Sequence, residues 1–207
     1  CVMSIVTYNN RSIRNISAIP GAAKSLTHIK TLTASGESTF NFVNGSSDVV
    51  LDSTYPIYVF KLINIHPSTN SRIELRGSTD TGSNYTATIT SNCFRAYADE
   101  ANSDTSLGYD TGSDAAQANF VDLINASTGT DNDQSGVATM YLFNPSSTTF
   151  VKHFIFETQG YAANDYTIHS FGAGYFNTTS AIDAIQFKSE NGNSDSGTFK
   201  MYGLKDS

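Results

Sequence analysis

The sequence has no tryptophan, only two cysteines and four prolines, and few charged residues. Charged side chains make up 15% of the 207 residues, against about 25% in an average soluble domain. Cys1 and Cys93 lie far apart and form no CxxC motif, which argues against a disulfide scaffold or a zinc cluster, and Cys93 is expected to be a small core residue. No apolar run approaches the ~18–20 residues of a membrane-spanning helix, so we expect no membrane span.

The charge balance argues against nucleic-acid binding. The 12 Lys and Arg residues are outnumbered by 19 Asp and Glu residues, which gives a formal net charge of -7. The basic residues are scattered along the chain, so no basic stripe is present that would neutralise phosphates. Ser, Thr, Asn and Gly occupy much of the polar surface instead, as is common in extracellular and virion β-proteins.

Apolar and polar residues alternate over short stretches, which is typical of half-buried β-strands. The clearest case is residues 72–76, RIELR, where two apolar side chains alternate with three charged ones. The longest apolar run is residues 55–65, with Pro56 at its entrance, where a strand tolerates proline best. Further strands are expected at 38–43, 85–90, 185–189, 198–204 and on both sides of an Asn-Pro-Ser-Ser turn at 144–147.

Only residues 113–127 have a helical pattern, with apolar side chains at helical spacing and Ser113 or Asp114 as a cap. An irregular crossover is the alternative for this stretch. No composition shift or long repeat marks a second domain. The sequence therefore predicts an all-β fold, a single-domain antiparallel β-sandwich or jelly roll with at most one short helix. We expect residues 1–20 to be an N-terminal arm or linker and residues 21–207 to be the β-sandwich domain.

No catalytic signature is present. The sequence contains neither a GxSxG elbow nor an HExxH motif. Lys152 and His153 stand side by side in an apolar run and are interpreted as part of a strand. Most acidic residues lie in turns, which does not favour the paired carboxylates of a glycoside hydrolase. We therefore predict no catalytic residue, no cofactor, and a protein that is not an enzyme.

The strongest candidate for a metal site is the turn at residues 130–136, TDNDQSG. Asp131, Asp133 and Ser135 occupy alternate positions and Gly136 the sixth, as in a calcium-binding loop. The pattern fails at the twelfth position, where Leu142 replaces the bidentate glutamate. A solvated turn is the favoured interpretation, and calcium binding is the alternative.

Tyrosine is frequent, with 11 residues, although tryptophan is absent. Carbohydrate-binding modules stack sugars on such rings, and Tyr109, Tyr161 and Tyr166 lie in loop-like segments where they are candidate glycan contacts. The favoured alternative is that the tyrosines fill the rims of the sandwich and keep their hydroxyl groups at the surface.

Several blocks of the sequence, in this order, resemble one known family. They are YNNRSIRNISAIP, DVVLDSTYPIYVFKLINIHPSTNS, GSTDTGSNYTATIT, FRAYADEA, DNDQSG, YLFNPSSTTFVKHFI, GYFNTTSAIDAIQFK and SGTFKMYGL. Together they resemble small virion structural proteins of marine bacteriophages, of the kind found in cyanophages and pelagiphages. The similarity runs from about Ser4 to Leu204. It implies a virion component and carries no established catalytic or ligand residue.

The resemblance leaves two positions on the particle open. The chain would belong to a tail fibre or other tail appendage, as a homo-oligomer and in particular a trimer that touches host-surface glycans, or it would decorate and cement the capsid. A glycan-binding attachment module would gather exposed tyrosines in one patch. A cement protein would carry an apolar surface that is buried only in the particle. A glycan-degrading enzyme and, because of Cys1, a lipid-anchored surface protein are less favoured alternatives.

Overall fold

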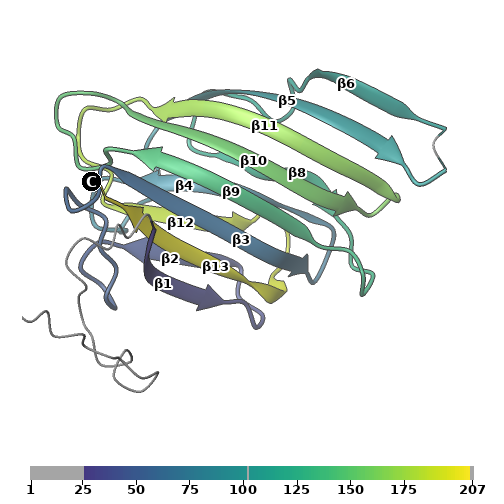
Figure 1. Cartoon of the computed structure of the whole chain (residues 1–207), viewed down its shortest axis with the longest axis horizontal. Helices are drawn as coiled ribbons and strands as arrows, with labels where there is room; N and C mark the ends of the chain where they lie inside the picture. The colour runs from purple at the N-terminus through teal and green to yellow at the C-terminus, as the bar shows by residue number, and fades with distance from the viewer. Residues whose placement is uncertain (1–25, 102, 206–207) are drawn as a thin grey trace, which may run out of the picture.

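The computed structural model describes residues 26–101 and 103–205, and the predicted arm at residues 1–20 lies outside them. Within the described residues the chain forms 13 antiparallel strands and no helix, in one nearly barrel-shaped sheet (Figure 1). Accordingly, no helix of this part of the chain is long and apolar enough to cross a membrane. The predicted all-β antiparallel class is confirmed, whereas the jelly-roll connectivity stays a prediction.

The sheet has two walls. The front wall is the run of strands that hydrogen-bond in the order β1–β13–β3–β9–β10–β11–β5–β6, with β7 paired to the start of β5. The back wall is the run β8–β4–β12–β2, and in Figure 1 β4, β12 and β2 pass behind the front strands. The walls meet where Ala162 of β10 pairs with Thr128 of β8.

The strands have the following bounds: β1 Thr27–Thr33, β2 Thr39–Val43, β3 Ile57–Pro67, β4 Ser71–Ser78, β5 Ile89–Asp99, β6 Thr105–Tyr109, β7 Ala115–Ala118, β8 Val121–Thr128, β9 Gly136–Phe143, β10 Lys152–Ala162, β11 Tyr166–Phe176, β12 Ala184–Ser189 and β13 Ser194–Leu204.

The predicted turn at residues 144–147 joins β9 to β10. Its closing hydrogen bond runs from the amide of Ser147 to the carbonyl of Asn144, 3.0 Å apart. Asn144 has a φ of 49°, a left-handed conformation that asparagine tolerates better than most residues. Lys152 and His153 are the first two residues of β10, which confirms that they belong to a strand.

The helix expected at residues 113–127 is wrong, because this stretch forms β7 and β8. Seven of the eight residues of β8 are buried, so the strand is covered on both sides. Ile124 lies against Gly136 and Gly160 of the front wall, and Asn125 hydrogen-bonds with Ser170 of β11. A strand buried on both faces has a nearly continuous apolar run without alternation, and such a run is easily mistaken for a helix.

Phenylalanine fills the space between the walls at the β2–β13 end. Phe40 of β2 stacks on Phe199 of β13 with ring centroids 3.9 Å apart. Phe60 and Phe42 each pack edge-on to Phe187 of β12, at 5.5 and 6.2 Å. These five side chains, here called the phenylalanine cluster, are at most 4% exposed. Burying each of them contributes about 1.5–3 kcal/mol to stability.

Candidate functional site

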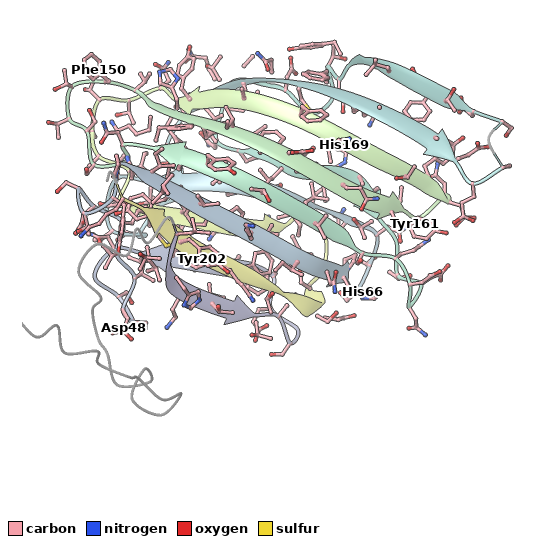
Figure 2. The ribbon with its side chains drawn as sticks, viewed as in Figure 1. Asp48, His66, Phe150, Tyr161, His169 and Tyr202 are labelled. Atoms are coloured by element: carbon pink, nitrogen blue, oxygen red, sulfur yellow. The ribbon has the colours of Figure 1, made fainter. Side chains whose placement is uncertain are left out.

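The three candidate glycan-contact tyrosines do not form one patch. Tyr109 ends β6, Tyr161 lies on β10, and Tyr166 begins β11. Tyr161 pairs with Thr167, whereas Tyr166 pairs with Ala162, so the two tyrosines point to opposite sides of the front wall. Figure 2 shows Tyr161 near the end of β10.

Each of these tyrosines donates its hydroxyl hydrogen bond to a nearby carboxylate. The acceptors are Asp114 for Tyr109 at 3.0 Å, Glu100 for Tyr161 at 2.8 Å and Asp104 for Tyr166 at 2.9 Å. In each case the hydrogen bond to an anion raises the pKa of the phenol above the ordinary value for tyrosine. The hydroxyls are thus held as neutral donors at the rim.

The turn at residues 130–136, the candidate metal site, is held together by hydrogen bonds of its own. Oε1 of buried Gln134 accepts a hydrogen bond from the backbone amide of Asp131 at 3.2 Å. The backbone amide of Gln134 donates to the Asp131 carbonyl at 2.8 Å. Asp131 and Asp133 are exposed, and Ser135 is half-buried. The described part of the chain contains no group of three or more His, Cys, Asp or Glu residues that could hold a metal ion. A solvated turn stays the prediction here, with calcium binding as the untested alternative.

The histidines make separate contacts. Nε2 of His28 lies 2.8 Å from the Thr31 hydroxyl, and Nε2 of His169 lies 3.0 Å from a carboxylate oxygen of Glu157. The ring of His153 meets that of Tyr175 edge-on at 6.0 Å. His66, the fourth histidine, lies with Nε2 3.2 Å from the Asp131 carbonyl oxygen, and all four make the contacts of histidines on a polar sheet surface.

Lys152 is a buried cation that sequence reasoning missed. Its side chain is completely buried, and Nζ donates to the carbonyls of Phe150 and Thr178 at 3.1 and 3.0 Å. Burial lowers the pKa of this amine. The signal was present in the alternation of β10, because Lys152 shares the parity of Phe154 and Phe156, which point inward. The two carbonyl contacts give Lys152 a structural role, joining the β9–β10 and β11–β12 connections.

The outward side of the front wall carries a group of exposed apolar side chains, here called the apolar face. Phe94 of β5 is 48% exposed and stacks on Phe171 of β11, with ring centroids 5.3 Å apart. Registered pairs place Tyr109 beside Phe94 and Tyr141 beside Ile155. The face consists of Phe94, Leu107, Tyr109, Val137, Tyr141, Ile155 and Phe171, all at least 36% exposed.

Shallow hollows follow the apolar face. One is lined by the aromatic rings of Phe94, Phe171 and Tyr141, with Ala173 and Ile155 between them. A second hollow continues past His153 and Tyr175, and a third lies beside Lys61 and His169. Figure 2 shows His169 on this surface of β11. Little in the sequence indicates this face, because Tyr141 and Ile155 alternate with core residues of the same apolar type.

A separate, polar hollow lies between the inner side of β5 and β11 and the strands β4 and β8. Its chemistry comes from Arg72, Arg95, Tyr97, Asp104, Asn125 and Tyr166, here called the arginine pocket. Arg72 pairs with Asp122 through Nη1 at 3.0 Å, and Arg95 pairs with Asp110 through Nη1 at 3.4 Å. Both guanidinium groups remain about one-third exposed, at 35% and 34%.

Buried polar groups form the floor of the arginine pocket. Nδ2 of Asn125 donates to Asp110 at 3.0 Å, and the Ser170 hydroxyl donates to Oδ1 of Asn125 at 2.7 Å. Burial raises the pKa of Asp122 to about 6, although Arg72 opposes this shift. Burial, reinforced by the nearby Asp110 carboxylate, also raises the pKa of the Cys93 thiol to about 11. Cys93 is completely buried, which confirms its expected place in the core.

No family model, no curated protein and no solved structure matches this chain.

Proposed function

We propose that this chain is a non-catalytic structural protein of a bacteriophage particle, and that its apolar face packs against a second copy of the same chain. The observation that carries the proposal is the apolar face itself. Exposed apolar side chains that gather on one side of a sheet are characteristic of surfaces that are covered in an assembly. An apolar surface of this kind is what a cement protein is expected to carry, whereas a glycan-binding module is expected to gather its tyrosines in one patch.

Electrostatics favours a second copy as the occupant. The whole chain has a formal net charge of -7, so two copies repel each other over most of their surfaces. Near the apolar face the outward-facing rows carry Glu157 together with Lys61 and Lys200, which are registered across β10, β9, β3 and β13. These rows hold two cations and one anion, with Asp114 beside Tyr109 at the β6 edge, so this side carries less net negative charge than the chain as a whole.

The oligomeric state tests the packing. We expect the full chain to be a homo-oligomer, and a trimer if it belongs to a tail fibre, in light scattering after size exclusion. The variant Phe94→Ser with Phe171→Ser should be a monomer, because it removes the stacked pair from the centre of the interface. The matched control is Phe120→Ser with Phe150→Ser, two exposed phenylalanines outside the apolar face, and it should assemble like the wild type. A monomeric wild type at micromolar concentration contradicts the packing.

Immunogold electron microscopy tests the place of the chain on the particle. An antibody against this chain, applied to purified phage that encode it, should label the head if the chain is a decoration protein and the tail if it belongs to an appendage. Absence of label from every virion overturns the structural role.

A further inference from the structure

We propose that the arginine pocket is a ligand site that takes a neutral sugar at the end of a glycan chain. This inference does not depend on the proposed packing, because the pocket opens on the inner side of β5 and β11 and not on the apolar face. It assigns one of the three candidate tyrosines, Tyr166, to a defined pocket and leaves Tyr109 and Tyr161 outside it.

The pocket is an open hollow with the volume of a small-ligand site. Its volume is about 320 Å³, at the lower end of the range of roughly 300–1,000 Å³ that small-ligand pockets occupy. Side chains from β4, β5, β8 and β11 converge on it, so it is formed only by the tertiary fold. A cavity of this size suits one or two sugar rings rather than a peptide or a polymer surface.

The donors of the pocket are held in place before any ligand arrives. An arginine side chain has five N–H donors, and Arg72 and Arg95 each engage a buried carboxylate through Nη1. Arg95 also lies over the ring of Tyr97, 5.8 Å from its centroid. Fixed donors lose little conformational entropy when they bind, which favours a ligand with several hydroxyl groups.

Acceptors and an aromatic wall complete the site. The exposed carboxylate of Asp104 accepts a hydrogen bond from the Tyr166 hydroxyl. It can accept a further hydrogen bond from a ligand hydroxyl. The rings of Tyr97 and Tyr166 meet edge-on with centroids 5.6 Å apart, and Ile168 adds an aliphatic surface. The pocket thus presents donors, acceptors and an apolar wall together, and a sugar ring has hydroxyls and C–H groups to match all three.

The local charge decides between a neutral and an acidic sugar. Two guanidinium groups, Arg72 and Arg95, face three carboxylates, those of Asp104, Asp110 and Asp122. Because the carboxylates are not outnumbered, the pocket has no excess positive charge to repay the desolvation of an anionic ligand. A neutral sugar avoids this cost.

A glycan array probed with the labelled full chain tests the assignment, using chains that end in neutral hexoses, N-acetylhexosamines, uronic acids or sialic acids. We expect binding to chains with neutral ends. Tyr166→Ala should raise the dissociation constant about tenfold or more, since it removes one wall of the pocket. Asp104→Asn keeps the shape of this exposed side chain, and it should raise the dissociation constant about threefold.

The matched control is Tyr161→Ala, which removes a tyrosine of the same strand pair with the same hydroxyl-to-carboxylate bond but on the opposite side of the front wall. It should bind like the wild type. Binding only to acidic ends, binding to no glycan, or equal binding by Tyr166→Ala overturns the proposal. So does loss of binding in Phe94→Ser with Phe171→Ser while Tyr166→Ala still binds, because the glycan would then occupy the apolar face.

Discussion

The two ends of the space between the walls are filled with different chemistry. At the β2–β13 end the five rings of the phenylalanine cluster are buried and pack against one another. At the β5–β8 end the same two walls enclose Asn125, Ser170 and Asp110, which hydrogen-bond to one another or to Arg95. One end is built for stability alone, and the other retains fixed polar groups next to an open pocket.

This difference has a physical basis in how each set of groups is satisfied. Aromatic rings need only close packing, so the first end can be sealed. Buried polar groups are tolerated only when they are hydrogen-bonded, and each bond constrains the direction of its partners. The polar end therefore contributes less to stability than the aromatic end, but it fixes the donors of the arginine pocket in space.

The largest effect is expected in the phenylalanine cluster. Phe187→Ala removes a completely buried ring that contacts Phe42, Phe60 and Phe199. It should lower the free energy of unfolding by about 3–5 kcal/mol, measured by urea denaturation. The control is Phe150→Ala, at a ring that is 71% exposed, where the change should stay within about 0.5 kcal/mol. Equal losses in both variants would remove the contrast between core and surface.

A smaller effect is expected at the polar end. Asn125→Ala leaves the buried Ser170 hydroxyl without its present acceptor and removes one of two partners of Oδ2 of Asp110, which keeps Arg95. The expected loss is about 1–3 kcal/mol, less than at the aromatic end. The matched control is Asn92→Ala at an exposed position of β5, which should leave the urea midpoint unchanged. A loss at Asn125 larger than that of Phe187→Ala would reverse the comparison.

The smallest effect concerns pH. The pKa of Asp122 is raised from its model-compound value of 3.8 to about 6 by burial, so between these values the folded state holds a proton that the unfolded state has released. Stability therefore falls as pH rises from about 4 to 6, by on the order of 1 kcal/mol. Asp122→Asn should remove this dependence, so the wild type should lose stability relative to the variant across the window.

Asp80 provides a control of opposite sign. Hydrogen bonds from Ser78 and Asn84 lower its pKa from 3.8 to about 2, so its contribution is fully present above pH 4 and is lost as pH falls through the lower value. The difference between wild type and Asp80→Asn should therefore stay flat from pH 4 to 7. Urea titrations at several pH values measure the difference in unfolding free energy between the wild type and each variant. A difference for Asp122→Asn that does not change with pH would contradict the raised pKa of Asp122.

Local patterns predicted those parts of the fold where a single face of a strand is buried. The alternation in β10 and the Asn-Pro-Ser-Ser turn at 144–147 were read correctly from their neighbours in sequence. The stretch 113–127 was not, because burial of β8 on both sides depends on strands that are distant in the chain. The alternation rule carries no information about a strand that has no wet face.

The candidate sites follow the same division. The sequence selected Tyr166 together with Tyr109 and Tyr161, but only pairing across β10 and β11 decided which side of the sheet each ring occupies. Arg72 and Arg95 gave no signal at all, since they lie 23 positions apart in sequence and meet only where β4 and β5 flank β8 and β11. The buried position of Lys152 was available from parity and was overlooked.

The sequence by itself determined the all-β antiparallel class, the low charge and acidic balance, and seven of the 13 strands, whereas the strand expected at 85–90 was wrong for residues 85–88, because β5 begins at Ile89. These properties follow from composition and from contacts between close neighbours along the chain. Only the tertiary structure decided where the apolar face and the arginine pocket lie. Both depend on the register and curvature of distant strands, and a shift of one residue in any strand would send its side chains to the other side of the sheet.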